Sequence, residues 1–271
     1  MNILQRFSPD PILADLDRRG VLTLELNRPQ TRNAFDQSLL ETLLAMLEQA
    51  GREPSVRLVL LIGRGPVFCA GGDVPWMAQL AAASPQERLR AARLICEAAA
   101  ALRRSPHPVV CAVQGAAIGG GVALVAAADL VLAAADAQFG LSEARLGLVP
   151  ACAAPFLLAR IGPTSTRRFF LTGQRVSAEE ARQAGLVDAL APNAEALTAM
   201  VQERLEQMLL CGPQALRHAK RLVDELSASQ RDFLSDAHLA LAAQAMADLW
   251  SSAEGREGMA AYLEKRPPVW P

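Results

Sequence analysis

Three consecutive glycines precede a run of small apolar residues in GAAIGGGVALVAAADLVLA, residues 115–133. No polar side chain separates Gly121 from Asp129, so the segment predicts a buried helix that begins on bare backbone amides. A P-loop needs Lys and then Ser or Thr directly after its glycines, and a dinucleotide fingerprint spaces its glycines as G-x-G-x-x-G. Here Val122 and Ala123 follow instead. The segment therefore disfavours a nucleotide loop and predicts a close-packed strand-to-helix turn.

The composition is that of a globular chain without the signs of a membrane or nucleic-acid protein. The chain has 271 residues, of which 51% are hydrophobic and 20% charged, and its formal net charge is -1. This length allows one large domain and an extension, and a net charge near zero predicts no general attraction to nucleic acid or anionic membranes. The apolar runs are broken by Asp or Gly, and the first residues do not form a signal peptide. We therefore expect a cytoplasmic protein without a membrane span.

The cysteines and histidines carry no metal or redox signature. The five cysteines form neither C-x-x-C pairs nor a small disulfide framework, which favours free thiols. The three histidines, His107, His218 and His238, are scattered along the chain. We therefore expect neither a metal site nor a Cys–His nucleophile pair.

Strands and helices alternate along most of the sequence. Apolar periodicity and capping residues predict strands within 12–26, a helix after Asp36, a strand at 56–63, a helix at 84–105, a strand after His107, the glycine helix and two strands within 129–140. From Ser177, which forms a capping box with Glu180, the chain is expected to be helical, with later helices near 194–209, 213–226, 229–250 and 254–264. A repeated strand–strand–helix unit predicts an α/β fold with parallel strands buried on both faces.

Six segments form an ordered series along the chain. They are NRPQTRNAF (27–35), FCAGGD (68–73), QGAAIGGGVAL (114–124), AQFGLSEARLGLVP (137–150), LTGQRVSAEEARQAGLVD (171–188) and YLEKRPPVW (262–270). Together they resemble the enoyl-CoA hydratase/isomerase, or crotonase, superfamily. The resemblance implies a crotonase-like spiral of strand–strand–helix units over residues 1–200 and a C-terminal helical trimerisation region over residues 201–271. It also implies an acyl-CoA thioester substrate and no separate cofactor, because coenzyme A is part of the substrate.

The helix predicted at 229–250 supports the implied assembly. Its apolar face carries Phe233, Leu234, Leu239, Leu241, Met246 and Leu249. This face lies beyond the predicted core and needs a partner. We therefore expect a homotrimer or a dimer of trimers.

The resemblance assigns a role to the bare glycine amides. In the superfamily, two backbone N–H groups hold the thioester oxygen while it gains negative charge. Carried over to this chain, they are the amides of Ala70, in the AGGD segment, and Gly120, the middle glycine of the triplet. The first N–H groups of a helix lack intrahelical partners, and the helix dipole adds positive potential there.

The resemblance also nominates one acid/base group. Many hydratases of the superfamily carry two glutamates, but the first of these positions is Ala123 here and only the second, Glu143, is retained. Two carboxylates readily divide the hydration of a double bond, whereas one carboxylate is enough for an isomerase. A subgroup resembling methylglutaconyl-CoA and carboxygeranoyl-CoA hydratases also lacks the first glutamate. The amino-acid sequence around Glu143 resembles that subgroup and favours it. The alternatives are a Δ3,Δ2-enoyl-CoA isomerase that uses Glu143 alone and a non-catalytic acyl-CoA-binding homologue.

Coenzyme A needs a cation for its phosphates and a slot for its adenine. The resemblance nominates Arg32 in the NRPQTRNAF loop, Asp73 at the end of FCAGGD, and Lys265 in the terminal segment. An association with RNA, known for one member of the superfamily, is disfavoured because the chain contains only two lysines and no basic helix.

Overall fold

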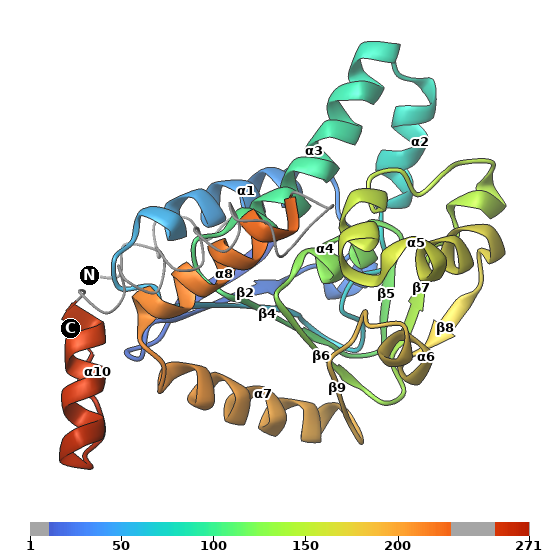
Figure 1. Ribbon diagram of the computed structural model, residues 1–271. Helices are drawn as coiled ribbons and strands as arrows, with labels where there is room; N and C mark the ends of the chain where they lie inside the picture. Colours follow the sequence, from blue (N-terminus) through green and yellow to red (C-terminus); the bar gives the residue numbers. More distant parts are fainter. Residues whose placement is uncertain (1–10, 229–252, 271) are drawn as a thin grey trace. The chain divides into compact units, whose positions relative to one another are not determined.

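The computed structural model describes residues 11–228 and 253–270 (Figure 1). The described part divides into two compact units, one formed by residues up to 105 together with 109–202, and the other by 106–108 and the chain from 203 onward. The predicted helix at 229–250, with the apolar face that supports a trimer, lies outside the described residues. The prediction of a trimer therefore stays a prediction.

A six-stranded sheet organises the first unit. Its strands are β1 (Ile12–Leu16), β2 (Val21–Leu26), β3 (Leu58–Gly63), β4 (Val109–Val113), β6 (Leu130–Ala134) and β9 (Ala189–Ala191), in the order β1-β2-β3-β4-β6-β9. β1 and β2 form an antiparallel hairpin, and every later neighbour is parallel. This is the predicted α/β arrangement.

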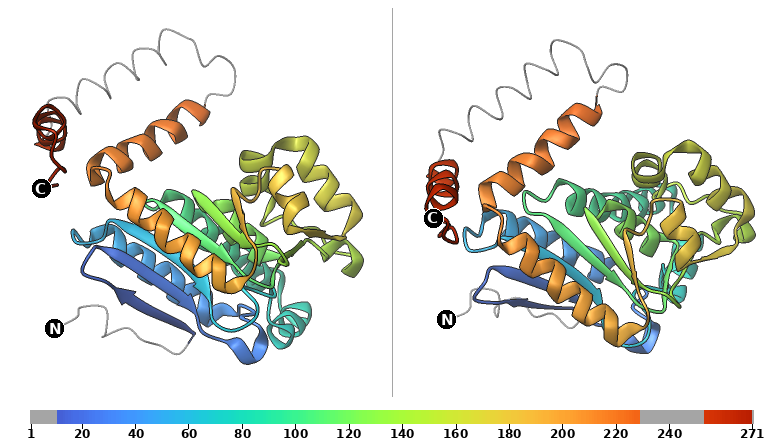
Figure 2. Two further views of the ribbon diagram at one scale, coloured as in Figure 1. Left: turned by 90° about the horizontal axis from the view of Figure 1, so that it is seen from below. Right: turned by 60° about the horizontal axis from the view of Figure 1, so that its bottom comes forward.

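Helices cover both faces of this sheet, as the views in Figure 2 show. Strand residues such as Leu24, Leu61 and Val113 belong to the main core, together with the buried sides of α1 (Gln37–Arg52) and α3 (Pro85–Arg104). The alternate strand residues, including Leu60, face the first part of α7 (Ala194–Leu209). Burial on both faces explains why these strands are continuous apolar runs in the sequence.

A second, three-stranded sheet contains β5 (Ala116–Ile118), β7 (Gln138–Gly140) and β8 (Arg175–Ser177), in the order β5-β7-β8. The helices beside these strands in the sequence are α4 (Gly120–Ala127), α5 (Ala154–Thr172) and α6 (Ala178–Gln183), the last opening with the predicted capping box. The expectation that the chain is helical from Ser177 onward is wrong at β9. Strands of three residues, such as β5 and β9, are too short to show an alternating pattern, so the sequence pattern did not identify them.

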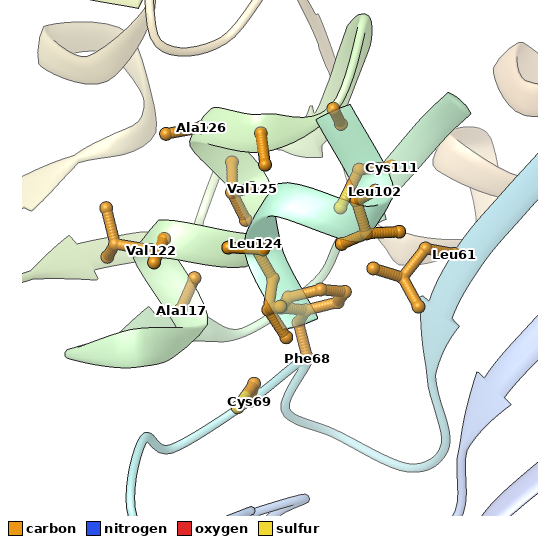
Figure 3. Packing of buried hydrophobic residues seen from close by; sticks show 14 of the residues in the cluster. Leu61, Phe68, Cys69, Leu102, Cys111, Ala117, Val122, Leu124, Val125 and Ala126 are labelled. Carbon is orange, nitrogen blue, oxygen red and sulfur yellow. The ribbon is translucent and has the colours of Figure 1, made fainter. Parts of the chain in front are cut away.

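The apolar stretch after the glycines forms α4, and every residue from Gly121 to Ala127 is buried. Phe68 and Cys69, which precede the AGGD glycines, are fully buried in the same cluster as Ala117 and Leu124 (Figure 3). The predicted buried helix is confirmed. Its packing places the FCAGGD segment against the start of α4.

The second unit contains α8 (Pro213–Ala228) and α10 (Ala253–Glu264), close to the predicted bounds of these helices. The buried Glu254 carboxylate accepts the backbone N–H groups of Gln214 and Ala215 at the start of α8, at 2.9 and 3.3 Å. Trp270 donates its indole N–H to the Leu210 carbonyl at 2.9 Å. No helix within residues 11–228 or 253–270 combines the length and the apolar character needed to cross a membrane.

Candidate active site

Two glycine-containing segments meet at the start of α4. Cys69 donates its backbone N–H to the Ala116 carbonyl at 3.0 Å and accepts the N–H of Ile118 at 2.9 Å, which forms a short parallel bridge. The bridge sets the next residues side by side, because a Cβ atom built on Gly71 would lie only 3.9 Å from the Cα of Gly119. The AGGD and GGG segments, far apart in the sequence, therefore form one site.

Each glycine of the triplet has a different neighbour where a side chain would stand. A Cβ atom on Gly119, which has a φ of +55°, would lie 3.1 Å from Glu143 Oε1. A Cβ atom on Gly120 would lie 2.5 Å from Phe35 Cζ, and one on Gly121 would lie 2.9 Å from the Cys69 carbonyl. Packing alone therefore accounts for all three glycines, and a catalytic role has to be argued from their amides.

The amides around this junction differ in what they bind. The Ala70 N–H donates to the Arg32 carbonyl at 3.0 Å, and the Gly71 N–H donates to the Cys69 thiol. Within the described residues, the N–H groups of Gly72 and Gly120 have no hydrogen-bond partner. The Ala70 amide predicted from the resemblance is thus already engaged with the chain itself. The amide two residues later, on Gly72, is available to a ligand.

Phe35 connects Gly72 with Gly120. Its N–H donates to the Gly71 carbonyl and its carbonyl accepts the Asp73 N–H, both at 2.8 Å, so that it forms a second short bridge. The ring lies against the Cα of Gly120 and 4.0 Å from where a Gly72 Cβ would stand. It also packs edge-on against Trp76, with ring centroids 6.2 Å apart. Phe35 therefore fixes the two available amides relative to one another.

Glu143 opens the short helix η3 (Glu143–Leu146), and its carboxylate lies beside Gly119. Its Oε2 atom is buried and has no hydrogen-bond partner in the described chain. Burial raises the pKa of this carboxyl, and a hydrogen bond from its own backbone N–H opposes the rise only in part. A half-buried carboxyl with a raised pKa and an unused oxygen is suited to moving a proton.

Cys152 lies near Glu143, because the Glu143 charge contributes to the raised pKa of its thiol. The Cys152 thiol donates to the Ala92 carbonyl of α3 at 3.5 Å, and its pKa is raised to about 12, mainly by burial. Ala123, where many hydratases carry their first glutamate, is fully buried in α4. No carboxylate contributes to the pKa of Glu143. The site as described thus contains a single acid/base group, and no cluster of potential metal ligands is found in the described chain.

The residues predicted to contact coenzyme A lie in different settings. Arg32 is exposed and has a φ of 55° at the end of the turn η2 (Pro29–Thr31). Asp73 is buried, and its carboxylate pairs with Arg28 and accepts the Trp76 N–H, so this carboxylate is already engaged as a helix cap. Lys265 follows α10 in the second unit, is exposed and has a φ of 53°. Arg32 and Asp73 both adjoin the site through their backbones, because the Arg32 carbonyl accepts the Ala70 N–H and the Asp73 N–H donates to the Phe35 carbonyl.

The sequence analysis missed two residues that the geometry brings forward. Gly72 was passed over in favour of Ala70, although Asp73 begins α2 (Val74–Ala82) as its N-cap. The Asp73 cap signals a helix start at the end of FCAGGD, but it does not say which amide before it lacks a partner, because that depends on tertiary contacts. Phe35 had no signal either, because its role depends on a bridge between segments distant in the sequence.

Comparisons with known proteins agree with this arrangement. The family profile described as enoyl-CoA hydratase/isomerase matches residues 17–271. The 1,2-epoxyphenylacetyl-CoA isomerase of Escherichia coli is 32% identical over 259 residues, covering 92% of this chain and 94% of the relative. The 2,3-dehydroadipyl-CoA hydratase of Escherichia coli is 32% identical over 252 residues, covering 93% and 95%. The solved structure of Pseudomonas aeruginosa AtuE is 40% identical with a TM-score of 0.90, covering 96% of this chain and 99% of that one. The chain belongs to the enoyl-CoA hydratase/isomerase family.

Proposed function

We propose that the protein hydrates the double bond of an enoyl-CoA thioester through an enolate held by the amides of Gly72 and Gly120. The observation that carries the proposal is the meeting of two unpartnered N–H groups and one half-buried carboxylate at the Gly71–Gly119 junction. Backbone donors aimed at a developing oxyanion are among the largest contributions to catalysis of this kind. The site offers the two parts that such chemistry requires.

Glu143 acts twice in this mechanism. It removes a proton from water while the water oxygen bonds to C3, and the electron pair of the double bond moves onto the thioester oxygen. The two amides stabilise that negative charge. Glu143 then returns the same proton to C2 as the enolate collapses, so water is added across the double bond with no other reactant. A raised pKa helps both steps, since the group must accept a proton and then release it.

Isomerisation is the second candidate, and the absence of a carboxylate at position 123 favours it. With Glu143 alone, the proton removed from C2 of a Δ3-enoyl-CoA is returned to C4, and the same amides hold the intermediate. The two relatives of equal identity are named one as a hydratase and one as an isomerase. Hydration is preferred because the amino-acid sequence around Glu143 resembles the corresponding sequence of hydratases that lack the first glutamate.

The acyl group and the assembly complete the proposal. We propose a carboxylated acyl chain of the methylglutaconyl type, supported by the amino-acid sequence around Glu143 and by similarity to a 2,3-dehydroadipyl-CoA hydratase.

Arg32 is proposed to contact the coenzyme A phosphates, because its side chain is exposed and its carbonyl accepts the Ala70 N–H of the AGGD segment. The Lys265 contact and the trimer are proposals from the resemblance. Light scattering at micromolar concentration tests the trimer.

Replacement of Glu143 tests the proposed chemistry. Glu143→Gln should lower kcat for hydration by about a hundredfold or more, because general acid/base groups contribute about 10² to 10⁴ in rate. Hydration and double-bond migration should be followed separately, with straight-chain and carboxylated enoyl-CoAs. Glu179→Gln, which removes an exposed carboxylate paired with Arg182, is the matched control and should keep full turnover. Acyl-CoA binding without turnover of any substrate would favour the non-catalytic homologue, and unchanged turnover in Glu143→Gln would remove Glu143 from the mechanism.

The raised pKa of Glu143 also predicts a pH dependence. The ionised form is the base, so the acidic limb of the kcat/KM profile should lie above the ordinary range of a glutamate. A carboxyl whose pKa is higher in the folded than in the unfolded state lowers stability as pH rises through those values. Glu143→Gln removes this effect, so the variant should be at least as stable as the parent at neutral pH. A urea titration at pH 5 and at pH 7.5 measures the difference.

A further inference from the structure

Arg28 makes a fork of contacts behind the proposed site. Its Nη1 donates to the Ala34 carbonyl at 2.6 Å and lies 3.0 Å from Asp36 Oδ2, while its Nη2 lies 3.1 Å from Asp73 Oδ2. The three side chains are 18%, 29% and 10% exposed, so the ion pairs are largely shielded from water. One guanidinium therefore joins two carboxylates that are 37 residues apart in the sequence.

Both carboxylates are helix N-caps. Asp36 Oδ1 accepts the Leu39 N–H of α1 at 3.0 Å, and Asp73 Oδ1 accepts the Trp76 N–H of α2 at 3.3 Å. Each aspartate thus uses one oxygen for its own helix and the other for Arg28. The guanidinium ties the first turns of α1 and α2 together at a fixed separation.

The residues just before these two caps are Phe35 and Gly72, the pair joined in the short bridge beside α4. A shift of α1 relative to α2 would slide this bridge, and with it the Gly72 amide and the Phe35 ring that lies against Gly120. The backbone of Arg28 is also held in place, because its N–H donates to Oδ1 of the buried Asn33 side chain at 2.9 Å. Asn33 in turn donates to the carbonyls of Arg64 and Val67.

We propose that Arg28 is a positioning residue for the oxyanion site, a role that rests on the proposed function. It touches no reacting atom and acts by fixing the Gly72 amide relative to Gly120. The planar fork is essential to this role, since a lysine ammonium is a point charge that cannot hold two carboxylates and a carbonyl in one plane. An oxyanion donor misplaced by about 1 Å loses much of its effect on rate.

The first unit contains a matched arginine that takes no part in the bridge between Phe35 and Gly72. Arg160 donates to the carbonyls of Ala128 and Leu186 at 2.7 and 2.9 Å and pairs with Asp188 at 2.6 Å. Its side chain is 11% exposed, somewhat less than that of Arg28. Its partners lie before β9 and at the C-terminal end of α4, the helix that begins with Gly120, but it contacts neither Gly72 nor Phe35 nor the helix caps beside them. A purely structural role for Arg28 predicts that the two arginines behave alike on substitution.

The experiment compares Arg28→Lys with Arg160→Lys in the full-length protein. Arg28→Lys should lower kcat about ten- to a hundredfold with less than a threefold change in KM, whereas Arg160→Lys should lose stability but keep kcat within twofold. Asp73→Asn gives a second route, because Asn remains a good N-cap while the charge that pairs with Arg28 is lost. It should lower kcat in the same way, and the Arg28→Lys/Asp73→Asn double variant should be no worse than the poorer single variant.

Hydrogen exchange followed by mass spectrometry separates this proposal from the proposed function. The reporter amides are those of Phe35 and Asp73, which are bonded across the bridge. Arg28→Lys and Asp73→Asn should speed exchange in peptides covering 33–40 and 70–77, and Arg160→Lys should not. If the parent protein turns over no enoyl-CoA, the proposed function fails, and faster exchange still supports positioning by Arg28. Parent-like exchange in both variants, or parent-like kcat in an active protein, overturns the role of Arg28.

Discussion

The helices α2 and α4 begin close to the same junction, yet α2 has an N-capping side chain and α4 has none. α2 is capped by Asp73, whose side chain accepts the Trp76 N–H, and α1, α3 and α6 have equivalent caps in Asp36, Ser84 and Ser177. The N-cap of α4 is Gly119, which has no side chain to offer. A cap satisfies an amide and stabilises the helix, but it also takes that amide away from any ligand. Among the described helices, α5 also lacks a side-chain cap bond, but α4 is the one that begins at the junction, where the N–H of its first residue is open to a ligand.

The contrast extends to what stands beside each helix start. At α2, the capping carboxylate is neutralised by Arg28 and fully used. At α4, the nearby carboxylate is Glu143, whose Oε2 has no partner in the described chain and whose pKa is raised by burial. Natural chains break local rules of satisfaction mainly at functional sites. An uncapped helix beside an unsatisfied carboxylate fits that pattern, whereas a capped helix beside a paired carboxylate does not.

Removing the Gly120 N–H should lower turnover more than any other change at a helix start. Proline is accepted at the first position of a helix, and Gly120 is that position in α4, so Gly120→Pro deletes the amide hydrogen without removing an intrahelical bond. We expect kcat to fall about a hundred- to a thousandfold with a smaller change in ground-state binding. Steady-state kinetics measures the fall, with circular dichroism as the check on folding.

The matched control for this variant is Gly120→Ala. It keeps the N–H but adds the same Cβ, which would lie 2.5 Å from Phe35 Cζ, so it carries the packing disturbance alone. The drop in kcat from Gly120→Ala to Gly120→Pro isolates the amide. Equal turnover in the two variants would show that the glycine serves packing only and that the proposed oxyanion site is wrong.

Gly72 should show a smaller effect of the same kind. Its amide lies before the N-cap of α2 and gains less from a helix dipole than the first amide of α4, so Gly72→Pro should lower kcat about ten- to a hundredfold. Gly72→Ala is the control, because its Cβ would meet the flexible end of Met77, at 2.9 Å from the sulfur, which can move away. Turnover equal in both variants would return the second donor to Ala70 or to another group.

Much of the fold could be predicted because its elements are periodic and capped. The alternation of β2, the leucine face of α1 and the capping box at Ser177 are local signals, and each produced the element expected from it. The strands β5 and β9 have only three residues each, and they form because β7 pairs with β5 and β6 pairs with β9. A pattern read along the chain cannot contain that information, since the pairing partner supplies most of the stabilisation.

The sequence predicted which segments form the site but not which backbone N–H groups in them are free to bind a ligand. The sequence identified both glycine segments and Glu143 through resemblance, and the structure brings them together. Which amide is available could not be read from residue types, because it depends on whether the Arg32 carbonyl reaches Ala70. Asp73 was predicted to help form the coenzyme A slot; its carboxylate caps α2 and pairs with Arg28, and the contact with coenzyme A stays a prediction. Long-range partners decide the use of a polar group, and they are set by tertiary structure.

The Ser177 cap of α6 should contribute to stability but not to turnover. Ser177 accepts the Glu180 N–H at 3.2 Å, and the Glu180 carboxylate accepts the Ser177 N–H at 3.0 Å. Ser177→Ala removes the side-chain half of this box and should destabilise the protein by about 1 kcal/mol, whereas Ser177→Gly should destabilise it by only a few tenths of that, because glycine tolerates the cap position. Urea unfolding measures both values, and kcat should stay within twofold of the parent for both. A loss of turnover that follows the loss of stability would mean that α6 is coupled to the site. In that case a side-chain cap in this protein would contribute to catalysis as well as to stability, and α4 would not differ from the capped helices in this respect.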